Sequence, residues 1–144
     1  MCIRDSTPIA LETILSEVNS SHKGDVISIF GCGGDRDKGK RAKMAEIAEK
    51  YSNGLIITND NPRWEDPHKI KKDIMKGLKK LSQANFIYDR EEAIKKGFYL
   101  LKSAKKDSVL IIAGKGHEDF QEIEGKKYPF SDKKIIQKLR NVIR

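Results

Sequence analysis

A ten-residue stretch, 58–67, concentrates side chains whose chemistry suits ligand binding. It places an acid, an amide and a guanidinium close together, at Asp60, Asn61 and Arg63, between two prolines. A carboxylate accepts hydrogen bonds from an ammonium group, and a guanidinium binds a carboxylate through two parallel hydrogen bonds. The stretch therefore suits a ligand that carries both an ammonium and a carboxylate. The alternative is a turn in which Asp60 and Asn61 satisfy only backbone groups, and the sequence favours neither interpretation.

Two further segments are rich in glycine and charge, and each follows an apolar run. In residues 31–40 the guanidinium of Arg36 offers a bidentate contact for an anion. In residues 114–119 the carboxylate of Glu118 offers an acceptor for an ammonium group, and Gly114 permits a close backbone approach or a positive φ. The alternatives are a flexible basic turn and a solvated glutamate, neither of which binds a ligand.

A phosphate-binding loop is partly matched in the first of these segments. Gly34, Gly39 and Lys40 fit the pattern GxxxxGK, but Arg41 stands where the Ser or Thr that holds Mg²⁺ belongs. Arg36 occupies the place of the third glycine in the dinucleotide-binding pattern GxGxxG. We therefore expect neither motif to operate here.

Metal binding and disulfide bonding are not indicated by the sequence. His117 and Glu118 begin the zinc-binding pattern HExxH, but Gln121 stands in place of the second His. Cys2 and Cys32 have neither the spacing of metal ligands nor that of a disulfide framework. We expect no metal site, and unpaired cysteines are typical of a cytoplasmic protein.

The composition is typical of one soluble globular domain. The chain has 144 residues, of which 38% are hydrophobic and 35% charged. No run approaches the about 18 apolar residues that cross a bilayer, so we expect no membrane partner. The net charge of +8 permits nucleic-acid binding, but the lysines are spread over all the expected helices without an arginine-rich block. We therefore expect no nucleic-acid partner; the competing hypothesis is a nucleic-acid-binding domain whose affinity falls steeply with salt.

The elements that must position these segments follow from hydrophobic periodicity. Four runs predict strands, at 25–30, 55–58, 84–88 and 108–113, and the first is rich in β-branched residues and predicted to be buried. Helical stripes flank and separate them, with predicted cap residues Thr7, Asp66, Asp89 and Asp132. This alternation predicts an α/β fold with a mostly parallel sheet, helices on both faces and a small C-terminal hairpin at an edge. Because ligands bind at the carboxyl ends of such strands, we expect the three loops to converge on one site.

Three segments, in this order along the chain, resemble the motifs of one enzyme family. They are residues 30–41, 60–67 and 113–119. Together they are similar to the C-terminal domain of the Mur ligases, and the similarity extends from about Thr7 to the C-terminus. The resemblance implies that residues 7–144 form a Rossmann-like, doubly wound domain that binds the incoming amino acid. Residues 1–6 are expected to be an unstructured start that is foreign to this domain.

The pattern is closest to the family members that add meso-diaminopimelate during peptidoglycan synthesis. In this family ATP, with Mg²⁺, converts the terminal carboxylate of a UDP-N-acetylmuramoyl dipeptide to an acyl phosphate, which the amine of the incoming amino acid attacks. Carried over by motif, the residues implied to bind meso-diaminopimelate are Arg36, Asp60, Asn61, Pro62, Arg63, Gly114 and Glu118. In this assignment Asp60, Asn61 and Arg63 bind the far end of the ligand. Arg36 binds a carboxylate, and Glu118 binds an ammonium.

The N-terminal and central domains of the family carry the ATP site and the magnesium ligands. The chain shows no counterpart of these domains, so we expect no catalytic residue and no ligase activity in it alone. Lysine lacks the second carboxylate of diaminopimelate, and a buried Arg63 left without a partner costs free energy when lysine binds. The alternatives are the C-terminal domain of a lysine-adding or other Mur ligase, for which Arg63 is the discriminating residue, and a stand-alone amino-acid-binding module.

Overall fold

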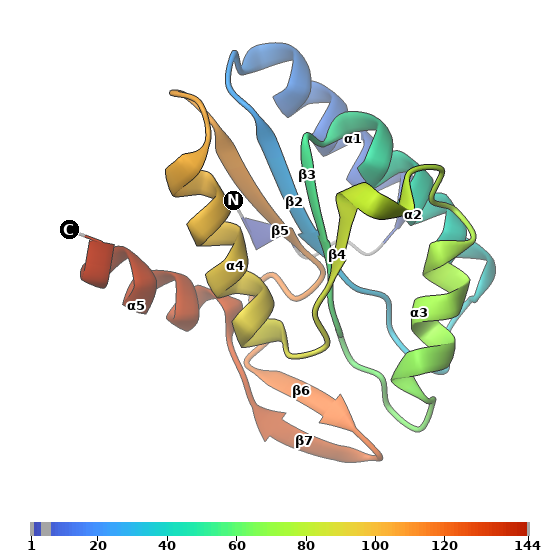
Figure 1. Cartoon of the computed structure of the whole chain (residues 1–144). Helices are drawn as coiled ribbons and strands as arrows, with labels where there is room; N and C mark the ends of the chain where they lie inside the picture. The colour runs from blue at the N-terminus through green and yellow to red at the C-terminus, as the bar shows by residue number, and fades with distance from the viewer. Residues whose placement is uncertain (1, 4–6, 144) are drawn as a thin grey trace.

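The computed structural model describes residues 2–3 and 7–143, in which helices and strands alternate along the chain (Figure 1). The bounds of the elements, in chain order, are β1 (Cys2–Ile3), α1 (Pro8–Ser21), β2 (Val26–Phe30), α2 (Gly39–Tyr51), β3 (Gly54–Ile57), α3 (Pro67–Met75), β4 (Ala84–Phe86), α4 (Arg90–Ser103), β5 (Val109–Ala113), β6 (Phe120–Ile123), β7 (Lys126–Pro129) and α5 (Asp132–Ile143). A short 3₁₀ turn, Leu81–Gln83, precedes β4.

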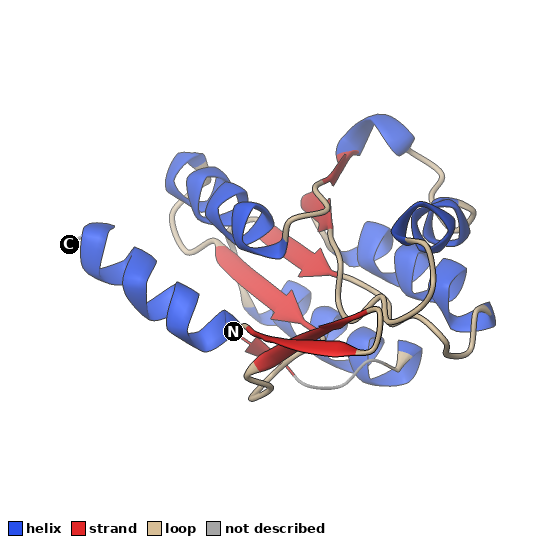
Figure 2. Ribbon diagram, turned by 90° about the horizontal axis from the view of Figure 1, so that it is seen from below, coloured by secondary structure: helices blue, strands red, loops and turns tan. Residues whose placement is uncertain are grey.

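Five strands form one parallel sheet in the order β1-β5-β2-β3-β4. The strands β6 and β7 pair antiparallel as a separate two-stranded sheet. Helices cover both faces of the main sheet, and the hairpin lies near the end where the strands finish (Figure 2). The predicted α/β fold, with a mostly parallel sheet and a small C-terminal hairpin, is confirmed. Within the described residues, no helix combines the length and apolar character needed to cross a membrane.

The strands are buried on both faces because alternate side chains enter two hydrophobic clusters. From β2, Val26 and Phe30 pack into a cluster with α1, α2 and α3, whereas Ile27 and Ile29 pack into a cluster with α4 and α5. This explains why the strands are continuous apolar runs in the sequence. The two helical layers hold the carboxyl ends of β2, β3 and β5 side by side, and the three predicted loops leave from these ends.

The prediction that residues 1–6 are unstructured is wrong for two of them. Cys2 and Ile3 form β1, which pairs in parallel with Ile112 and Ala113 of β5. The pairing uses backbone groups of β5 that would otherwise form an open edge of the sheet. A two-residue strand is too short to show a periodicity in the sequence. Residues 1 and 4–6 lie outside the described part of the chain, and the foreign origin of the segment stays a prediction.

Three of the four predicted helix caps are confirmed. The side chains of Thr7, Asp66 and Asp89 accept hydrogen bonds from backbone N–H groups in the first turns of α1, α3 and α4. The prediction for Asp132 is wrong, because Asp132 is the first residue of α5. The hydroxyl of Ser131 accepts the first-turn hydrogen bond instead, at 3.3 Å. The carboxylate of Asp132 is engaged by another helix.

A fully buried ion pair joins α4 to α5. Arg90 donates from Nε and Nη2 to the two carboxylate oxygens of Asp132, at 2.8 and 2.7 Å, and neither side chain is exposed. The same guanidinium donates to the carbonyls of Asn59 and Ala113, at 3.2 and 3.1 Å. These carbonyls lie where the chain leaves β3 and β5. Arg90 therefore fixes the starting points of two loops as well as the packing of two helices.

A second buried arginine ties the loop after β2 to the loop after β3. Arg41, on α2, donates to both carboxylate oxygens of Glu65, at 2.8 and 2.6 Å, and to Asp73 of α3 at 3.0 Å. Its Nη2 also donates to the carbonyl of Gly33 at 2.9 Å. The hydrogen bonds from Arg41 lower the pKa of the Glu65 carboxyl from its ordinary value of 4.5 to about 2.

Replacing Asp132 by Ala removes the carboxylate that faces the buried charge of Arg90. We expect the free energy of unfolding to fall by about 3–5 kcal/mol, the cost of breaking a buried ion pair by removing one partner. Urea denaturation measures this change. The matched control is Glu91→Gln, which removes an exposed ion pair with Lys95 on the same helix and should leave the urea midpoint unchanged. An Asp132→Ala midpoint equal to that of the wild type contradicts the prediction.

Acid should weaken the Arg41–Glu65 pair within a defined pH window. Because the pKa of Glu65 is lower in the folded chain than in the unfolded chain, the pair stabilises the fold above pH 4.5, and this stabilisation is lost as the pH falls towards 2. In Glu65→Gln the carboxylate is absent at every pH. The difference in free energy of unfolding between wild type and variant should therefore be largest near neutral pH and shrink below pH 4.5. Urea denaturation at each pH tests this, and a pH-independent difference would refute it.

Candidate functional site

The loops after β2, β3 and β5 enclose a cleft of about 350 Å³. The convergence expected for a parallel α/β sheet is therefore observed. Six of the seven residues predicted to bind a ligand line this cleft, namely Arg36, Asp60, Asn61, Arg63, Gly114 and Glu118. The seventh, Pro62, does not line it. The role of these residues in binding stays a prediction.

The first two loops approach each other through their backbones. The N–H of Gly34 donates to the carbonyl of Asn61 at 2.8 Å. A Cβ at position 34 would lie 1.8 Å from the carbonyl oxygen of Pro62, so only glycine fits there. The glycine thus serves the contact between two loops. Pro62 contributes to the shape of the turn, and its carbonyl accepts a hydrogen bond from the N–H of Glu65 at 3.1 Å.

A lysine that the sequence analysis missed lies at the centre of the acidic part of the cleft. The side chain of Lys115 is fully buried. Its Nζ donates to Oδ1 of Asn61 at 2.8 Å and to the carbonyl of Phe120 at 3.0 Å. It also lies 3.2 Å from Oδ1 of Asp60 and 3.6 Å from Oε2 of Glu118. One ammonium group therefore holds three of the predicted ligand-binding side chains in place.

Two carboxylates share this buried lysine, so the three side chains together keep one net negative charge. Asp60 is 7% exposed, and its Oδ1 faces Lys115 as an ion pair without hydrogen-bond geometry. Oε2 of Glu118 accepts a hydrogen bond from Nδ2 of Asn61 at 3.3 Å. Gly114 has a φ of +123°, and a Cβ there would come within 3.0 Å of Oδ2 of Asp60. The chain passes close to this carboxylate because the residue is glycine.

Arg63 is held through both its backbone and its side chain. Its φ is +53°, in the left-handed region that residues other than glycine seldom adopt. Nη1 donates to the carbonyl of Gly34 at 2.9 Å, and Nε lies 3.4 Å from Oε2 of Glu122 in β6. The side chain is 20% exposed and lines the cleft. The guanidinium is therefore fixed at the cleft before any ligand binds.

Arg36 is exposed and lines the same cleft, together with Lys40. Within the described part of the chain, Arg36 makes no hydrogen bond or ion pair. Its guanidinium is therefore available to a carboxylate. Among the residues that line the cleft, the carboxylates of Asp60 and Glu118 and the guanidiniums of Arg36 and Arg63 give the arrangement that the sequence suggested for a ligand with both kinds of charge.

The P-loop pattern does not form a phosphate-binding loop in the described residues. The N–H of Gly34 donates to the carbonyl of Asn61 in the loop after β3, residues 58–66, called the central loop below. Arg41, at the Ser/Thr position, pairs with Glu65. No group of three or more His, Cys, Asp or Glu within residues 2–3 and 7–143 is placed to hold a metal ion. Cys32 lines the cleft, but burial raises the pKa of its thiol to about 12, so the thiol stays neutral and is a poor nucleophile.

Three residues that organise the cleft had no such role in the sequence analysis: Lys115, Arg41 and Glu122. Lys115 carries a signal, because it stands between two glycines, two residues after a buried strand. In the sequence, Arg41 stands out only because it replaces the Ser or Thr of the P-loop pattern. Glu122 carries no local signal, because its partner Arg63 belongs to a distant segment of the chain.

Known proteins are similar to this chain in sequence and in fold. The family model described as Mur ligase, glutamate ligase domain, matches residues 6–116. A relative from Aquifex aeolicus (strain VF5) is 46% identical over 133 residues, which cover 92% of this chain and 27% of the relative. A relative from Clostridioides difficile (strain 630) is 48% identical over 130 residues, which cover 90% of this chain and 26% of the relative. Both are named UDP-N-acetylmuramoyl-L-alanyl-D-glutamate--2,6-diaminopimelate ligase.

A solved structure of an enzyme with the same name superposes on this chain with a TM-score of 0.87 at 36% sequence identity. The superposition covers 98% of this chain and 29% of that chain. The chain thus spans about a quarter of the length of the curated relatives it matches. The family match includes the loops after β2 and β3 and the first residues of the loop after β5. The predicted resemblance is confirmed, and the chain belongs to the Mur ligase family.

Proposed function

We propose that the chain is the amino-acid-binding domain of an ATP-dependent ligase that adds meso-diaminopimelate to UDP-N-acetylmuramoyl-L-alanyl-D-glutamate. The observation that carries this proposal is that the carboxylates of Asp60 and Glu118 and the guanidiniums of Arg36 and Arg63 line one cleft of about 350 Å³. The names of the relatives and of the structural neighbour support it.

The charges of the cleft match those of meso-diaminopimelate, which carries an ammonium and a carboxylate at each end. Asp60 and Glu118 both lie beside Lys115, so they are close enough to receive one ammonium between them. Arg63 binds the carboxylate of that same end, and Arg36 binds the carboxylate of the other end. Holding the far ammonium between two acids leaves the amine of the other end to form the amide.

Asn61 acts mainly on its neighbours. Its Oδ1 already accepts hydrogen bonds from Nζ of Lys115 at 2.8 Å and from the N–H of Glu122 at 3.0 Å. Its Nδ2 donates to Glu118 at 3.3 Å, which leaves one N–H for a ligand. We therefore assign Asn61 the orientation of Glu118, with at most one direct hydrogen bond to the amino acid.

ATP, Mg²⁺ and the UDP-muramoyl dipeptide belong to the proposal for the full-length ligase. ATP supplies the phosphoryl group that makes the dipeptide carboxylate electrophilic. The described residues form neither a P-loop nor a metal site, so we assign them no step in that activation. They bind and orient the attacking amino acid. A cytoplasmic location is part of the same proposal, and the free thiol of Cys32 agrees with a reducing compartment.

Arg63 accounts for a preference for diaminopimelate over lysine. Lysine has no second carboxylate, so the guanidinium of Arg63 would stay without a ligand partner in the lysine complex. A site built around a hydrogen-bonding group rejects an analogue that lacks this group far better than an apolar pocket rejects a missing methylene. The same argument keeps a lysine-adding Mur ligase as the weaker alternative.

Replacing Arg63 by Lys keeps the charge but removes the bidentate geometry. We expect the affinity of the chain for meso-diaminopimelate to fall about ten- to a hundredfold, as for the loss of a hydrogen bond to a charged group, with little change for L-lysine. Isothermal titration calorimetry measures both affinities. The matched control is Arg140→Lys, an exposed residue of α5 that does not line the cleft, and it should leave both affinities unchanged.

Two results contradict the proposed function. One is the absence of meso-diaminopimelate binding by the wild-type chain at millimolar concentrations. The other is an Arg63→Lys variant that binds meso-diaminopimelate as tightly as the wild type, because the discriminating contact would then lie elsewhere.

A further inference from the structure

The β6–β7 hairpin is bound along its first strand to the loop that contains Asp60 and Arg63. The amide of Gln121 donates to the carbonyl of Asp60 at 2.8 Å. The N–H of Arg63 donates to the carbonyl of Glu122 at 3.0 Å, and the N–H of Glu124 donates to the carbonyl of Arg63 at 2.7 Å. Arg63 thereby forms an isolated parallel bridge with the hairpin. The central loop is in effect paired with β6 as a further strand would be.

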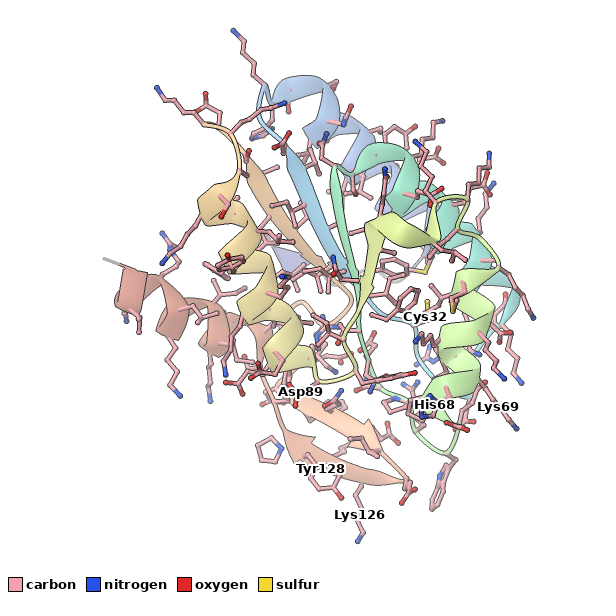
Figure 3. The ribbon with its side chains drawn as sticks, in the orientation of Figure 1. Cys32, His68, Lys69, Asp89, Lys126 and Tyr128 are labelled. Carbon is pink, nitrogen blue, oxygen red and sulfur yellow. The ribbon has the colours of Figure 1, made fainter. Side chains whose placement is uncertain are left out.

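This pairing holds Arg63 in a backbone conformation that it would not keep alone. A φ of +53° is unfavourable for arginine and persists only where the surroundings impose it. Both the N–H and the carbonyl of Arg63 are bound by the hairpin. In strand β7, by contrast, the side chains of Tyr128 and Lys126 are exposed and point away from the main sheet (Figure 3).

The hairpin also supplies the carboxylate that orients the guanidinium of Arg63. Nε of Arg63 lies 3.4 Å from Oε2 of Glu122, and the carbonyl of Gly34 accepts from Nη1 at 2.9 Å. The two side chains are 20% and 26% exposed, so the pair is partly shielded from water. The guanidinium is thus held from two sides, and it lines the cleft in this orientation.

The hairpin follows the part of the chain that the family model matches. The family match ends at residue 116, before β6 and β7 begin. In contrast, a match of 133 of the 144 residues with the relative from Aquifex aeolicus necessarily includes residues 120–129. The residues of the hairpin are therefore aligned with a relative named for diaminopimelate, and they follow the residues that the family model matches.

We propose that the β6–β7 hairpin is the specificity element of this domain, and that Glu122 is the residue that positions the guanidinium of Arg63 for the second carboxylate of the amino acid. The proposal rests on the function proposed above. Glu122 is a positioning residue in it, since it acts on the ligand through Arg63. The opposite possibility is that Glu122 competes with the ligand for Arg63, and the experiments below distinguish the two.

The first experiment needs no ligand. In the ¹⁵N-labelled 144-residue chain, the Nε–H of Arg63 should give a signal with a positive heteronuclear NOE, because the guanidinium is held in place. Glu122→Gln should lose this order. Glu124→Gln, which makes the same change of charge on an exposed side chain of the same hairpin, should keep it. An Arg63 signal that is unchanged in Glu122→Gln overturns the proposal.

The second experiment measures selectivity by calorimetric titration with meso-diaminopimelate and L-lysine. Glu122→Gln should lower the ratio of the two affinities about fivefold, the size that the loss of one partly exposed ion pair allows, whereas Glu124→Gln should leave the ratio unchanged. Equal losses for both amino acids indicate a merely structural role and contradict the proposal. A higher affinity for diaminopimelate in Glu122→Gln also overturns it, because Glu122 would then be a competitor of the ligand.

Failure of the proposed function can be recognised separately. If the wild-type chain binds neither amino acid, the assignment of the ligand is wrong, and the NMR experiment alone decides whether Glu122 positions Arg63. If the wild type binds diaminopimelate selectively and Glu122→Gln keeps both the selectivity and the ordered Arg63 signal, the proposed function stands and the role of the hairpin does not.

Discussion

The cleft depends on the pairing of the buried ammonium group of Lys115 with the oxygens around it. A charge removed from water is stable only when it is paired and hydrogen-bonded. The oxygens around this ammonium come from Asn61, Asp60, Glu118 and Phe120, which belong to the central loop, the loop after β5 and the hairpin. Satisfying one buried charge therefore requires segments that are distant in the sequence to meet. The same requirement holds two carboxylates at the cleft.

Two buried arginines hold together the backbone segments around the cleft, as Lys115 holds together its acidic side chains. Arg90 joins α5 to the ends of β3 and β5, and Arg41 joins the first loop to the central loop and α3. Each guanidinium binds backbone carbonyls as well as carboxylates, so it sets the path of a loop and not only the distance between two helices. The cleft is thus preorganised, which reduces the free energy lost in ordering it when a ligand binds.

Two arginines that line the cleft, Arg36 and Arg63, differ in how firmly they are held. Arg36 is exposed and engaged by no described residue, so its guanidinium is free to move. Arg63 is instead fixed through its backbone and its guanidinium. An arginine that cannot move away discriminates more strongly than a mobile one, because it stays without a partner when the matching carboxylate is missing. In the proposed function the shared fold supplies the cleft, and the β6–β7 hairpin bound to Arg63 decides which amino acid fits.

The sequence by itself determined strands β2 to β5, the helices and three of the caps, because hydrophobic periodicity and N-capping act over a few neighbouring residues. It also indicated the side chains that meet in the cleft, since the carboxyl ends of parallel strands share one edge. Only the tertiary structure decided which charges are buried and which partners they have. Glu122 looks like an ordinary solvated residue in the sequence, and neither Lys115 nor Asp132 shows there which charged group it meets, because burial depends on the packing of elements that are far apart along the chain. Their oxygens and nitrogens find partners only when those elements come together.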